Sequence, residues 1–302
     1  MTPETRISQV RFVTFASSNA MRALRRIRRQ ALAFGFLPSH INTFTERDLD
    51  PSFLSKMGRR MRKGVRGYGY WCWKPQVVLQ VLNQIPEGCV VLYVDAGCHL
   101  NSQGRMRFCE YLDVMEKTDM LVFQSRIPSA GPRTELEYHY LPEGQWCKGA
   151  LLDFFGVREN DNVVRTGQIG SGIFLIRKTA KTMDFFRRFV AVFFDHYELA
   201  DDSPSCTPNL PGFRENRHDQ SIFLIMCKLA GYDLCSLSSC EYVPYSEWLP
   251  AKYRTGTCRT WNEMMRCPIL ARRDISYGWR AWIPLWAKRM VFYLLGCVRV
   301  AA

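Results

Sequence analysis

The chain has 302 residues, of which 47% are hydrophobic and 23% charged, and its formal net charge is +13. This length allows one large domain or two small ones, and the ordinary composition excludes wholesale disorder. No run of about 18 apolar residues occurs, which excludes a conventional membrane-spanning helix. The unusual quantity is the positive charge.

The positive charge is concentrated in the two flanks of the chain. Residues 21–74 carry a net charge of +10 and residues 250–302 a net charge of +8, whereas residues 75–249 carry −6. This distribution predicts an anionic partner, and the candidates are nucleic acid, a nucleotide and a membrane surface.

The chain contains 12 cysteines, scattered among apolar residues and without a CxxC pair, so a zinc site has little support. Residues 1–12 lack the apolar core of a secretory signal peptide. We therefore expect a cytoplasmic protein whose cysteines are reduced and pack as small apolar side chains.

Strand patterns alternate with helix patterns along the chain, which predicts an α/β fold. The run 88–95 is almost continuously apolar and fits a strand buried on both faces, as in a mainly parallel sheet. Residues 203–213 are rich in proline and predict a surface loop. The predicted strands are 7–16, 88–95, 120–124 and 172–176, and the predicted helices are 20–34, 75–82, 104–117, 179–198 and 218–230.

The first candidate functional residue is Asp95, which ends the predicted strand 88–95 and precedes Ala96 and Gly97. Open α/β sheets bind ligands outside the carboxyl ends of their strands. An aspartate at that place can hold a divalent cation against a diphosphate, because hard cations prefer oxygen ligands. The alternative is that Asp95 only caps the following turn.

The second candidate is Asp219, which stands with His218 and Gln220 at the start of the predicted helix 218–230. A carboxylate there can accept a proton from a substrate hydroxyl within hydrogen-bond reach. The alternative is an ordinary first-turn aspartate, with His218 as a surface side chain.

Two further segments have ligand-binding character. Residues 167–172 contain three glycines, which permit close approach of a ligand to the backbone, although a tight turn explains them equally well. They match neither the phosphate loop nor the dinucleotide fingerprint, which disfavours P-loop NTPases and dinucleotide enzymes.

Residues 66–75 interleave aromatic and cationic side chains, which can stack on a base or sugar and neutralise phosphate. Core packing is the alternative there, with at least two of the rings at 70, 71 and 73 buried.

Taken together, these segments resemble bacterial GT-A-type glycosyltransferases of O-antigen, lipopolysaccharide and capsule biosynthesis. The matching pieces occur in the expected order; they are RGYGYWCWKP (66–75), LYVDAGC (92–98), QWCKGALLDFF (145–155), TGQIGSGIFLIRK (166–178) and ENRHDQSIF (215–223). The resemblance implies a GT-A-like, Rossmann-type catalytic domain over residues 1–249, with a mixed, mainly parallel sheet flanked by helices. It also implies a hexosyltransferase with a nucleotide-sugar donor, expected to be a UDP-sugar, and a glycan acceptor.

The same resemblance implies roles for particular residues. Asp219, with His218, matches the catalytic position: a general base in an inverting enzyme, or a group that positions the sugar in a retaining one. Donor binding falls to Asp95, Ala96, Gly97, Arg66, Tyr70, Trp73, Lys74 and Lys148. The loop between donor and acceptor comprises Gln168, Gly170, Ser171 and Gln220.

A divalent metal, Mn²⁺ or Mg²⁺, is the cofactor that the resemblance implies. In such families a DxD motif binds the metal and the donor diphosphate, but here the motif reads Asp95-Ala96-Gly97 and lacks its second acid. Either Asp95 works with another ligand, for which His99 and His218 are candidates, or arginine and lysine hold the donor.

The segment 250–302 forms a predicted basic, aromatic helical tail. Trp279, Trp282, Trp286, Met290 and Tyr293 recur at helical spacing, and basic residues accompany them. Such a helix suits an anionic membrane interface, on which a lipid-linked acceptor would lie. We expect a protein bound peripherally to the inner face of the membrane; the alternative is that the tail packs on the catalytic domain.

Two other classes of function remain open at the level of sequence. A nucleic-acid-binding protein would use the basic flanks, although the acidic centre disfavours it and we expect no nucleic-acid partner. A non-catalytic sugar-nucleotide-binding homologue would bind the donor without turnover. The donor sugar, the linkage, the stereochemical outcome and the oligomeric state are not predicted.

Overall fold

The computed structural model describes residues 2–124, 127–128, 138–139, 142–235, 237–238, 242–244, 266–271 and 275. The helices are α1 (Pro3–Ser8), α2 (Met21–Phe34), α3 (Pro51–Met57), α4 (Gly67–Tyr70), α5 (Trp73–Gln84), α6 (Arg105–Met115), α7 (Gly149–Phe154), α8 (Asp161–Val164), α9 (Ala180–Asp195) and α10 (Asp219–Leu229). The strands are β1 (Arg11–Phe15), β2 (Ile41–Phe44), β3 (Val90–Val94), β4 (His99–Leu100), β5 (Met120–Leu121), β6 (Phe123–Gln124), β7 (Ile127–Pro128), β8 (Tyr138–His139), β9 (Ile173–Arg177), β10 (Leu237–Ser238), β11 (Tyr242–Pro244) and β12 (Ile269–Ala271).

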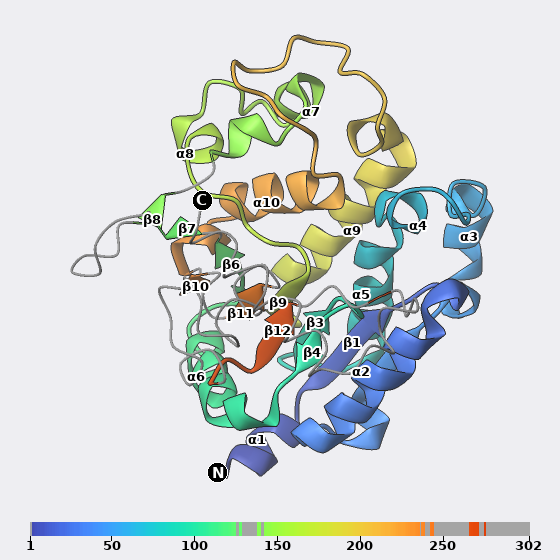
Figure 1. Cartoon of the computed structure of the whole chain (residues 1–302), viewed down its shortest axis with the longest axis vertical. Coiled ribbons are helices and arrows are strands. Elements are labelled where there is room, and N and C mark those ends of the chain that lie inside the picture. Colours follow the sequence, from blue (N-terminus) through green and yellow to red (C-terminus); the bar gives the residue numbers. More distant parts are fainter. Residues whose placement is uncertain are drawn as a thin grey trace, which may run out of the picture.

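A five-stranded sheet with the order β2-β1-β3-β9-β5 lies at the centre of the fold (Figure 1). Strand β1 pairs in parallel with β2 and β3, whereas β9 runs antiparallel to both β3 and β5. Within this sheet β9 therefore opposes the common direction of the other strands. The prediction of a mixed, mainly parallel sheet flanked by helices is confirmed.

The reversed direction of β9 determines which loops meet. Val94, the last residue of β3, pairs with Ile173, the first residue of β9. One residue further, the Asp95 backbone N–H donates a hydrogen bond to the Gly172 carbonyl oxygen at 2.8 Å. The glycine-containing loop before β9 consequently lies beside the carboxyl end of β3.

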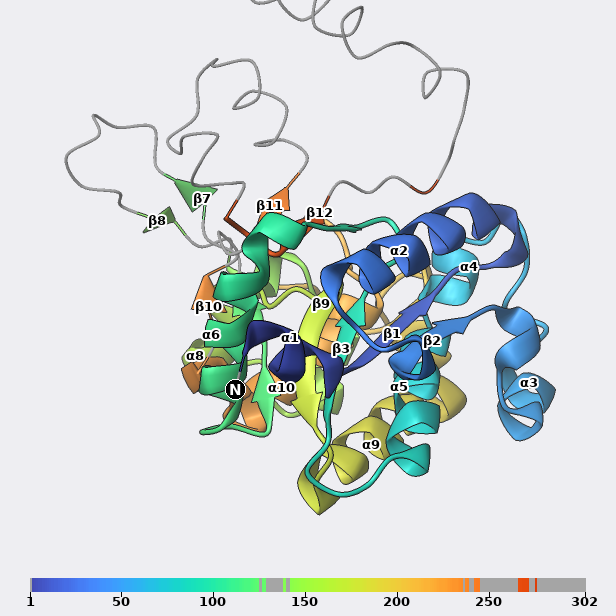
Figure 2. The same ribbon diagram turned by 90° about the horizontal axis from the view of Figure 1, so that it is seen from below.

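Helices cover both faces of the sheet. Figure 2 shows α2 and α6 on one side and α5 and α9 on the other. Along β3, Val91 and Tyr93 join the core that includes α5, α9 and α10, while Leu92 and Val94 join the core that includes α2 and α6. All four side chains are completely buried, which confirms the prediction of a strand buried on both faces.

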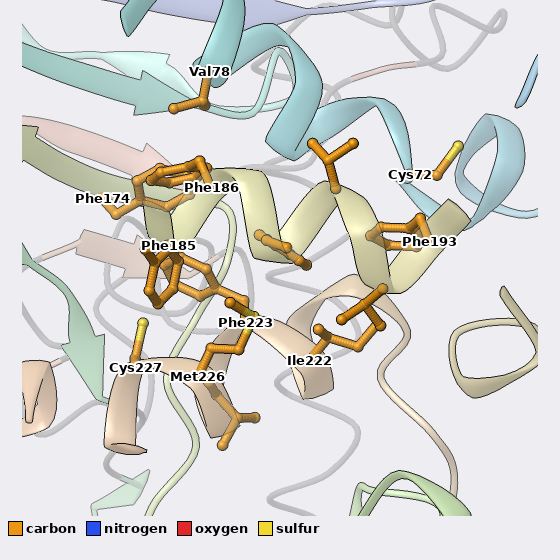
Figure 3. Packing of buried hydrophobic residues seen from close by; sticks show 14 of the residues in the cluster. Cys72, Val78, Phe174, Phe185, Phe186, Phe193, Ile222, Phe223, Met226 and Cys227 are labelled. Carbon is orange, nitrogen blue, oxygen red and sulfur yellow. The ribbon is translucent and has the colours of Figure 1, made fainter. Parts of the chain in front are cut away.

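An aromatic cluster fixes α10 against the sheet (Figure 3). Phe174 of β9 stacks on Phe223 of α10 at 4.8 Å between ring centroids, and Phe185 of α9 meets the same ring edge-on at 5.9 Å. Each such pair adds about 0.5–1.5 kcal/mol beyond the burial of its area. This packing holds the start of α10, and with it Asp219, in a fixed place.

The predicted elements agree with the structure in their main lines, with three differences at element bounds. The predicted first strand is too long, because Thr2 caps and Pro3 opens α1 through Ser8, and β1 begins only at Arg11. The segment 120–124 divides into β5, which pairs with β9, and β6, which pairs with β10. The helix predicted from Pro75 already begins at Trp73.

The aromatic segment is less buried than predicted. Of its rings at 70, 71 and 73, only Trp73 is buried, while Tyr70 and Trp71 are partly exposed. Trp73 stacks on Phe15 of β1 at 3.9 Å between centroids. The backbone before Trp73 is irregular, with positive φ at Tyr70 and Trp71, and Trp71 packs against the core while staying partly exposed.

The predicted membrane-associating tail, residues 250–302, lies outside the described residues apart from 266–271 and 275. Its strand β12 pairs with β11 and, in antiparallel orientation, with β4. Among the described residues, no helix combines the length and the apolar character that crossing a membrane requires. The eight cysteines whose side chains the structure describes are free, and six of them are buried, as expected for small apolar side chains.

Candidate functional site

One cavity of about 280 Å³ lies where β3 ends and where β9 and α10 begin. Its lining combines two carboxylates, several cations and glycine backbone; the residues are Arg66, Trp71, Lys74, Asp95, Gly97, Cys98, Gly170, Ser171, Gly172, Ile173, Arg217, His218, Asp219, Gln220, Ala271 and Ile275. Open α/β folds bind ligands at this end of their strands. The structure thus brings segments separated by more than 120 residues into one candidate active site.

Asp95 lines the cavity just beyond the end of β3 and is held by its neighbours. The Tyr93 hydroxyl donates a hydrogen bond to Asp95 Oδ1 at 2.7 Å, and the Lys74 ammonium lies 3.6 Å from the same oxygen. The carboxylate keeps about a third of its surface exposed (34%). Arg26 of α2 fixes the following turn by donating hydrogen bonds to the carbonyl oxygens of residues 96 and 98.

The glycine at position 172 is required by the close approach of Asp95. A Cβ atom on Gly172 would lie 2.8 Å from Asp95 Oδ2, closer than such atoms approach in proteins. The absence of a side chain therefore lets the carboxylate turn into the cavity, which gives this position of the glycine-containing loop a specific role.

Asp219 is buried and shares a hydrogen-bond network with two other cavity residues. Lys74 Nζ donates to Asp219 Oδ2 at 2.6 Å, Ser171 Oγ donates to the same oxygen at 2.8 Å, and Lys74 Nζ also reaches Ser171 Oγ at 3.1 Å. The second oxygen, Asp219 Oδ1, makes no hydrogen bond or ion pair with the described residues. It is therefore the atom available to a ligand.

Burial and neighbouring charges have opposite effects on the pKa values of Asp219 and Lys74. Burial raises the pKa of Asp219, and the nearby Lys74 and Ser171 offset this in part. For Lys74, burial alone would lower the pKa, but the attraction of Asp219 and Asp95 outweighs it and the pKa is raised. The lysine is therefore charged at neutral pH, and the aspartate is a stronger base than a surface carboxylate.

His218 precedes Asp219 in a strained backbone conformation, with φ of 58°. Its Nδ1 donates a hydrogen bond to the Ala200 carbonyl oxygen at 2.6 Å, while Nε2 is buried without a hydrogen-bond partner. Burial, with Arg66 nearby, lowers the pKa of His218, so the imidazole is neutral at pH 7. The ring stacks on Trp71 at 5.8 Å between centroids.

Positive φ angles also occur in the aromatic segment whose Tyr70 and Trp71 contact the His218 ring. Tyr68, Tyr70 and Trp71 also have positive φ, at 56°, 52° and 59°. Tyr70 contacts the His218 ring at 5.0 Å and donates a hydrogen bond from its hydroxyl to Asp202. Backbone strain of this kind costs about 1–3 kcal/mol per residue and clusters at functional sites.

Two arginines provide positive charge at the cavity. Arg66 lies 3.7 Å from both Asp202 and Glu215 and keeps 46% of its side chain exposed. Arg217 pairs with Glu215 at 3.2 Å and lies over the Trp146 ring at 4.1 Å. Guanidinium groups of this kind suit bidentate binding of phosphate oxygens.

Most of the predicted site residues line this cavity, but five do not. Trp73 packs in the core and donates a hydrogen bond from Nε1 to the Gly67 carbonyl oxygen. Lys148 is buried elsewhere, where it donates to the Glu198 carbonyl oxygen at 2.6 Å and pairs with Asp201 at 3.4 Å. The others outside the lining are Tyr70, Ala96 and Gln168.

Several features of the site are not apparent from the sequence. Arg217 stood inside the quoted segment 215–223, and its place two residues before Asp219 was the available signal. Tyr93 gave no signal, because a strand tyrosine normally indicates core packing. The prediction for Lys74 is donor binding, whereas in the structure its ammonium contacts Asp219, Ser171 and Asp95.

The described residues of the cavity do not offer the donor set of a protein-bound divalent metal ion. Asp95 Oδ1 and Asp219 Oδ2 both face the Lys74 ammonium instead of a common vacancy. His99 lies outside the lining, with its Nδ1 3.0 Å from Gln30 Nε2, and His218 Nδ1 is used by Ala200. Among the residues that the structure describes, no three His, Cys, Asp or Glu side chains form a metal-binding group.

No protein-family model matches the chain, and no curated protein matches it in sequence. Three solved structures are similar. A glycosyltransferase involved in glycosylation of the major capsid of PBCV-1 has a TM-score of 0.44 and 6% identity, over 90% of this chain and 95% of that chain. Mouse xyloside xylosyltransferase 1 has a TM-score of 0.42 and 8% identity (87% of this chain, 96% of that chain), and the galactosyltransferase LgtC with donor and acceptor sugar analogues has a TM-score of 0.42 and 10% identity (86% of this chain, 85% of that chain). With identities this low and TM-scores below 0.5, these similarities do not assign a function to the chain.

Proposed function

We propose that the chain is a GT-A-type glycosyltransferase that moves a sugar from a UDP-sugar to a hydroxyl group of a lipid-linked or growing bacterial surface glycan. The observation that carries this proposal is the convergence of Asp95 and Asp219 in one cavity at the carboxyl end of β3. The ordered set of motifs that resembles these transferases supports it, because their catalytic and donor-binding segments are the ones that meet there.

On the donor side, the cavity supplies fixed charge for a diphosphate. Arg66 and Arg217 line it and carry guanidinium groups with N–H donors for phosphate oxygens. Asp95, held by Tyr93, can accept hydrogen bonds from a sugar or ribose hydroxyl through Oδ2, which has no partner among the described residues. Gly97, Gly170 and Gly172 leave room for close approach of the ligand.

On the acceptor side, Asp219 is the proposed catalytic base. In an inverting reaction its free Oδ1 takes the proton of the acceptor hydroxyl. The acceptor oxygen then forms a bond to the anomeric carbon, while the bond from that carbon to the diphosphate oxygen breaks and UDP leaves with the electron pair. In a retaining reaction the same carboxylate positions and stabilises the reacting sugar. A pKa raised by burial suits the proton transfer.

We place the protein in the cytoplasm, peripherally on the inner face of the membrane. The predicted amphipathic segment 250–302 is one basis for this, and the outer face of α2 is a second. Arg22, Arg25, Arg28 and Arg29 of α2 are exposed, and no ion pair engages them within the described part of the chain. Anionic lipid attracts such a surface by about 1 kcal/mol for each basic residue.

The test of the proposal is the variant Asp219→Asn, which keeps the size of the side chain but removes the base. UDP release from a panel of UDP-hexoses, with and without glycolipid-containing membranes, should fall by about 10²-fold or more. The affinity for UDP, measured by calorimetry, should stay within about tenfold of the parent chain.

The matched control is Asp233→Asn, which changes an aspartate beyond the other end of α10 and outside the cavity lining. It should keep full turnover. Unchanged turnover in Asp219→Asn would contradict the assignment of the base, whereas UDP binding without turnover in the parent chain would favour a non-catalytic homologue.

A further inference from the structure

We infer that Lys74 is the resident cation of this cavity: its ammonium takes the place between Asp95 and Asp219 that a divalent metal ion would hold, so that the site binds its donor without a metal. The inference deepens the proposed function, on which it rests for the identity of the donor. The exclusion of a metal ion by Lys74 does not depend on which donor the cavity binds.

The ammonium is fully engaged by the side chains around it. It lies 2.6 Å from Asp219 Oδ2, 3.1 Å from Ser171 Oγ and 3.6 Å from Asp95 Oδ1. The first two contacts are hydrogen bonds, and the third is an ion pair just beyond hydrogen-bond distance. Only 2% of the Lys74 side chain is exposed, so neither water nor a cation from solution has free access to its place.

The fold delivers the lysine to this point rather than leaving it on a flexible stem at the surface. Lys74 is the second residue of α5, which packs on α9 and on the sheet beneath β1 and β3. The ammonium also lies over the Tyr93 ring, 5.6 Å from its centroid, while the hydroxyl of that tyrosine binds Asp95. Both carboxylates are therefore oriented by one buried cation.

A metal ion and this lysine exclude one another. A dication bound between Asp95 and Asp219 would stand within a few ångströms of a buried positive charge and would take away its counter-ions. The DxD pattern also lacks its second acid here, so Asp95 is the more exposed of the two carboxylates among the described residues of the lining, at 34% against 5% for Asp219. The diphosphate charge is then balanced by Arg66 and Arg217, which line the cavity.

The experiment combines manganese binding with nucleotide binding on the full chain. Mn²⁺ titrated into the nucleotide-free protein and followed by electron paramagnetic resonance should show no stoichiometric site. UDP titrated in the presence of EDTA, and again in the presence of Mn²⁺, should give dissociation constants that agree within about twofold. The variant Lys74→Ala, which uncovers two facing carboxylates, should gain one Mn²⁺ site.

The matched control is Lys228→Ala. Lys228 is also buried, on α10, but its ammonium donates to the Val163 carbonyl oxygen outside the cavity. Its removal should create no manganese site. If Lys74→Ala fails to fold, the two measurements on the parent chain still decide the question.

Stoichiometric Mn²⁺ binding by the parent chain that Asp95→Asn abolishes would overturn the inference, as would a tenfold or greater loss of UDP affinity in EDTA. Absence of UDP binding under both conditions would contradict the proposed donor instead. In that case the manganese titration alone tests the role of Lys74. A wrong donor and a wrong role for Lys74 therefore give different results.

Discussion

At the scale of single residues, the site depends on contacts between residues that lie far apart in the sequence. The positions of Asp95 and Asp219 could be predicted, because each follows or precedes a clear apolar element. The ion pair between Lys74 and Asp219 could not, since 145 residues separate the partners and the pairing exists only once α5 and α10 pack on the same face of the sheet. Trp73 and Lys148 are the opposite case, because they were predicted to bind the donor but pack in the interior. Trp73 stacks on Phe15, and Lys148 donates a hydrogen bond to the Glu198 carbonyl oxygen.

Gly172→Ala should weaken donor binding through Asp95. The added methyl group would lie 2.8 Å from Asp95 Oδ2 and would turn the carboxylate out of the cavity. We expect a loss of UDP affinity of about tenfold or more, which calorimetry measures. In an Asp95→Ala background the same substitution should have no further effect. An equal loss in both backgrounds would show that the glycine acts otherwise than through Asp95.

Glu143 gives a prediction about stability and pH. It is fully buried, accepts a hydrogen bond from Cys147 Sγ at 3.0 Å, and burial raises its pKa to about 8, although Lys228 opposes the shift. Because the folded chain holds this proton and the unfolded chain does not, stability should fall as pH rises from about 4.5 to 8, by about 1.4 kcal/mol per pH unit from this group.

The variant Glu143→Gln, which mimics the protonated acid, tests this linkage. Its melting temperature should drop less than that of the parent chain between pH 6 and pH 9. The expectation fails if both proteins lose stability in parallel over that interval.

At the scale of elements, the alternation of strands and helices was predictable but the direction of β9 was not. The segment 172–176 gives the same apolar pattern in either orientation, and only pairing with β3 and β5 makes it antiparallel. That reversal is what places Ser171 and Gly172 beside Asp95. The split of residues 120–124 into β5 and β6 has a similar origin, because the first part of this short segment pairs with β9 and the last part pairs with β10.

The arginine face of α2 gives the prediction at this scale. The triple variant Arg22→Glu/Arg25→Glu/Arg29→Glu should bind vesicles of phosphatidylcholine with 30% phosphatidylserine roughly 100-fold more weakly, since each basic residue contributes about 1 kcal/mol. Sedimentation with vesicles measures the loss. UDP affinity should be retained, because these side chains do not line the cavity.

The control places the same charge change on the opposite side of the sheet, on α9, in the variant Lys181→Glu/Arg187→Glu/Arg188→Glu. All three side chains are exposed. This variant should keep most of the vesicle binding. Equal losses in both variants would show that net charge, rather than the α2 surface, governs the association.

At the scale of the whole molecule, the charge of +13 separates into parts with different places in the fold. The first basic flank forms the exposed face of α2 and ends in the strained aromatic segment that covers His218. The acidic centre carries Asp95 and Asp219, and Lys74, the last residue of the first basic flank, lies between their carboxylates. Arg66 and Arg217 add the positive charge that a diphosphate needs. This distribution favours a nucleotide-sugar enzyme over a nucleic-acid-binding protein.

A thermal-shift titration with UDP, GDP, dTDP and CDP tests whether this cavity binds a nucleoside diphosphate. A ligand at 100 times its dissociation constant stabilises the folded chain by about 2.7 kcal/mol, so UDP should raise the melting temperature by about 5 °C or more. The rise should disappear in Asp95→Asn. No shift with any of the four nucleotides, together with tight and steeply salt-dependent binding of nucleic acid, would contradict the account.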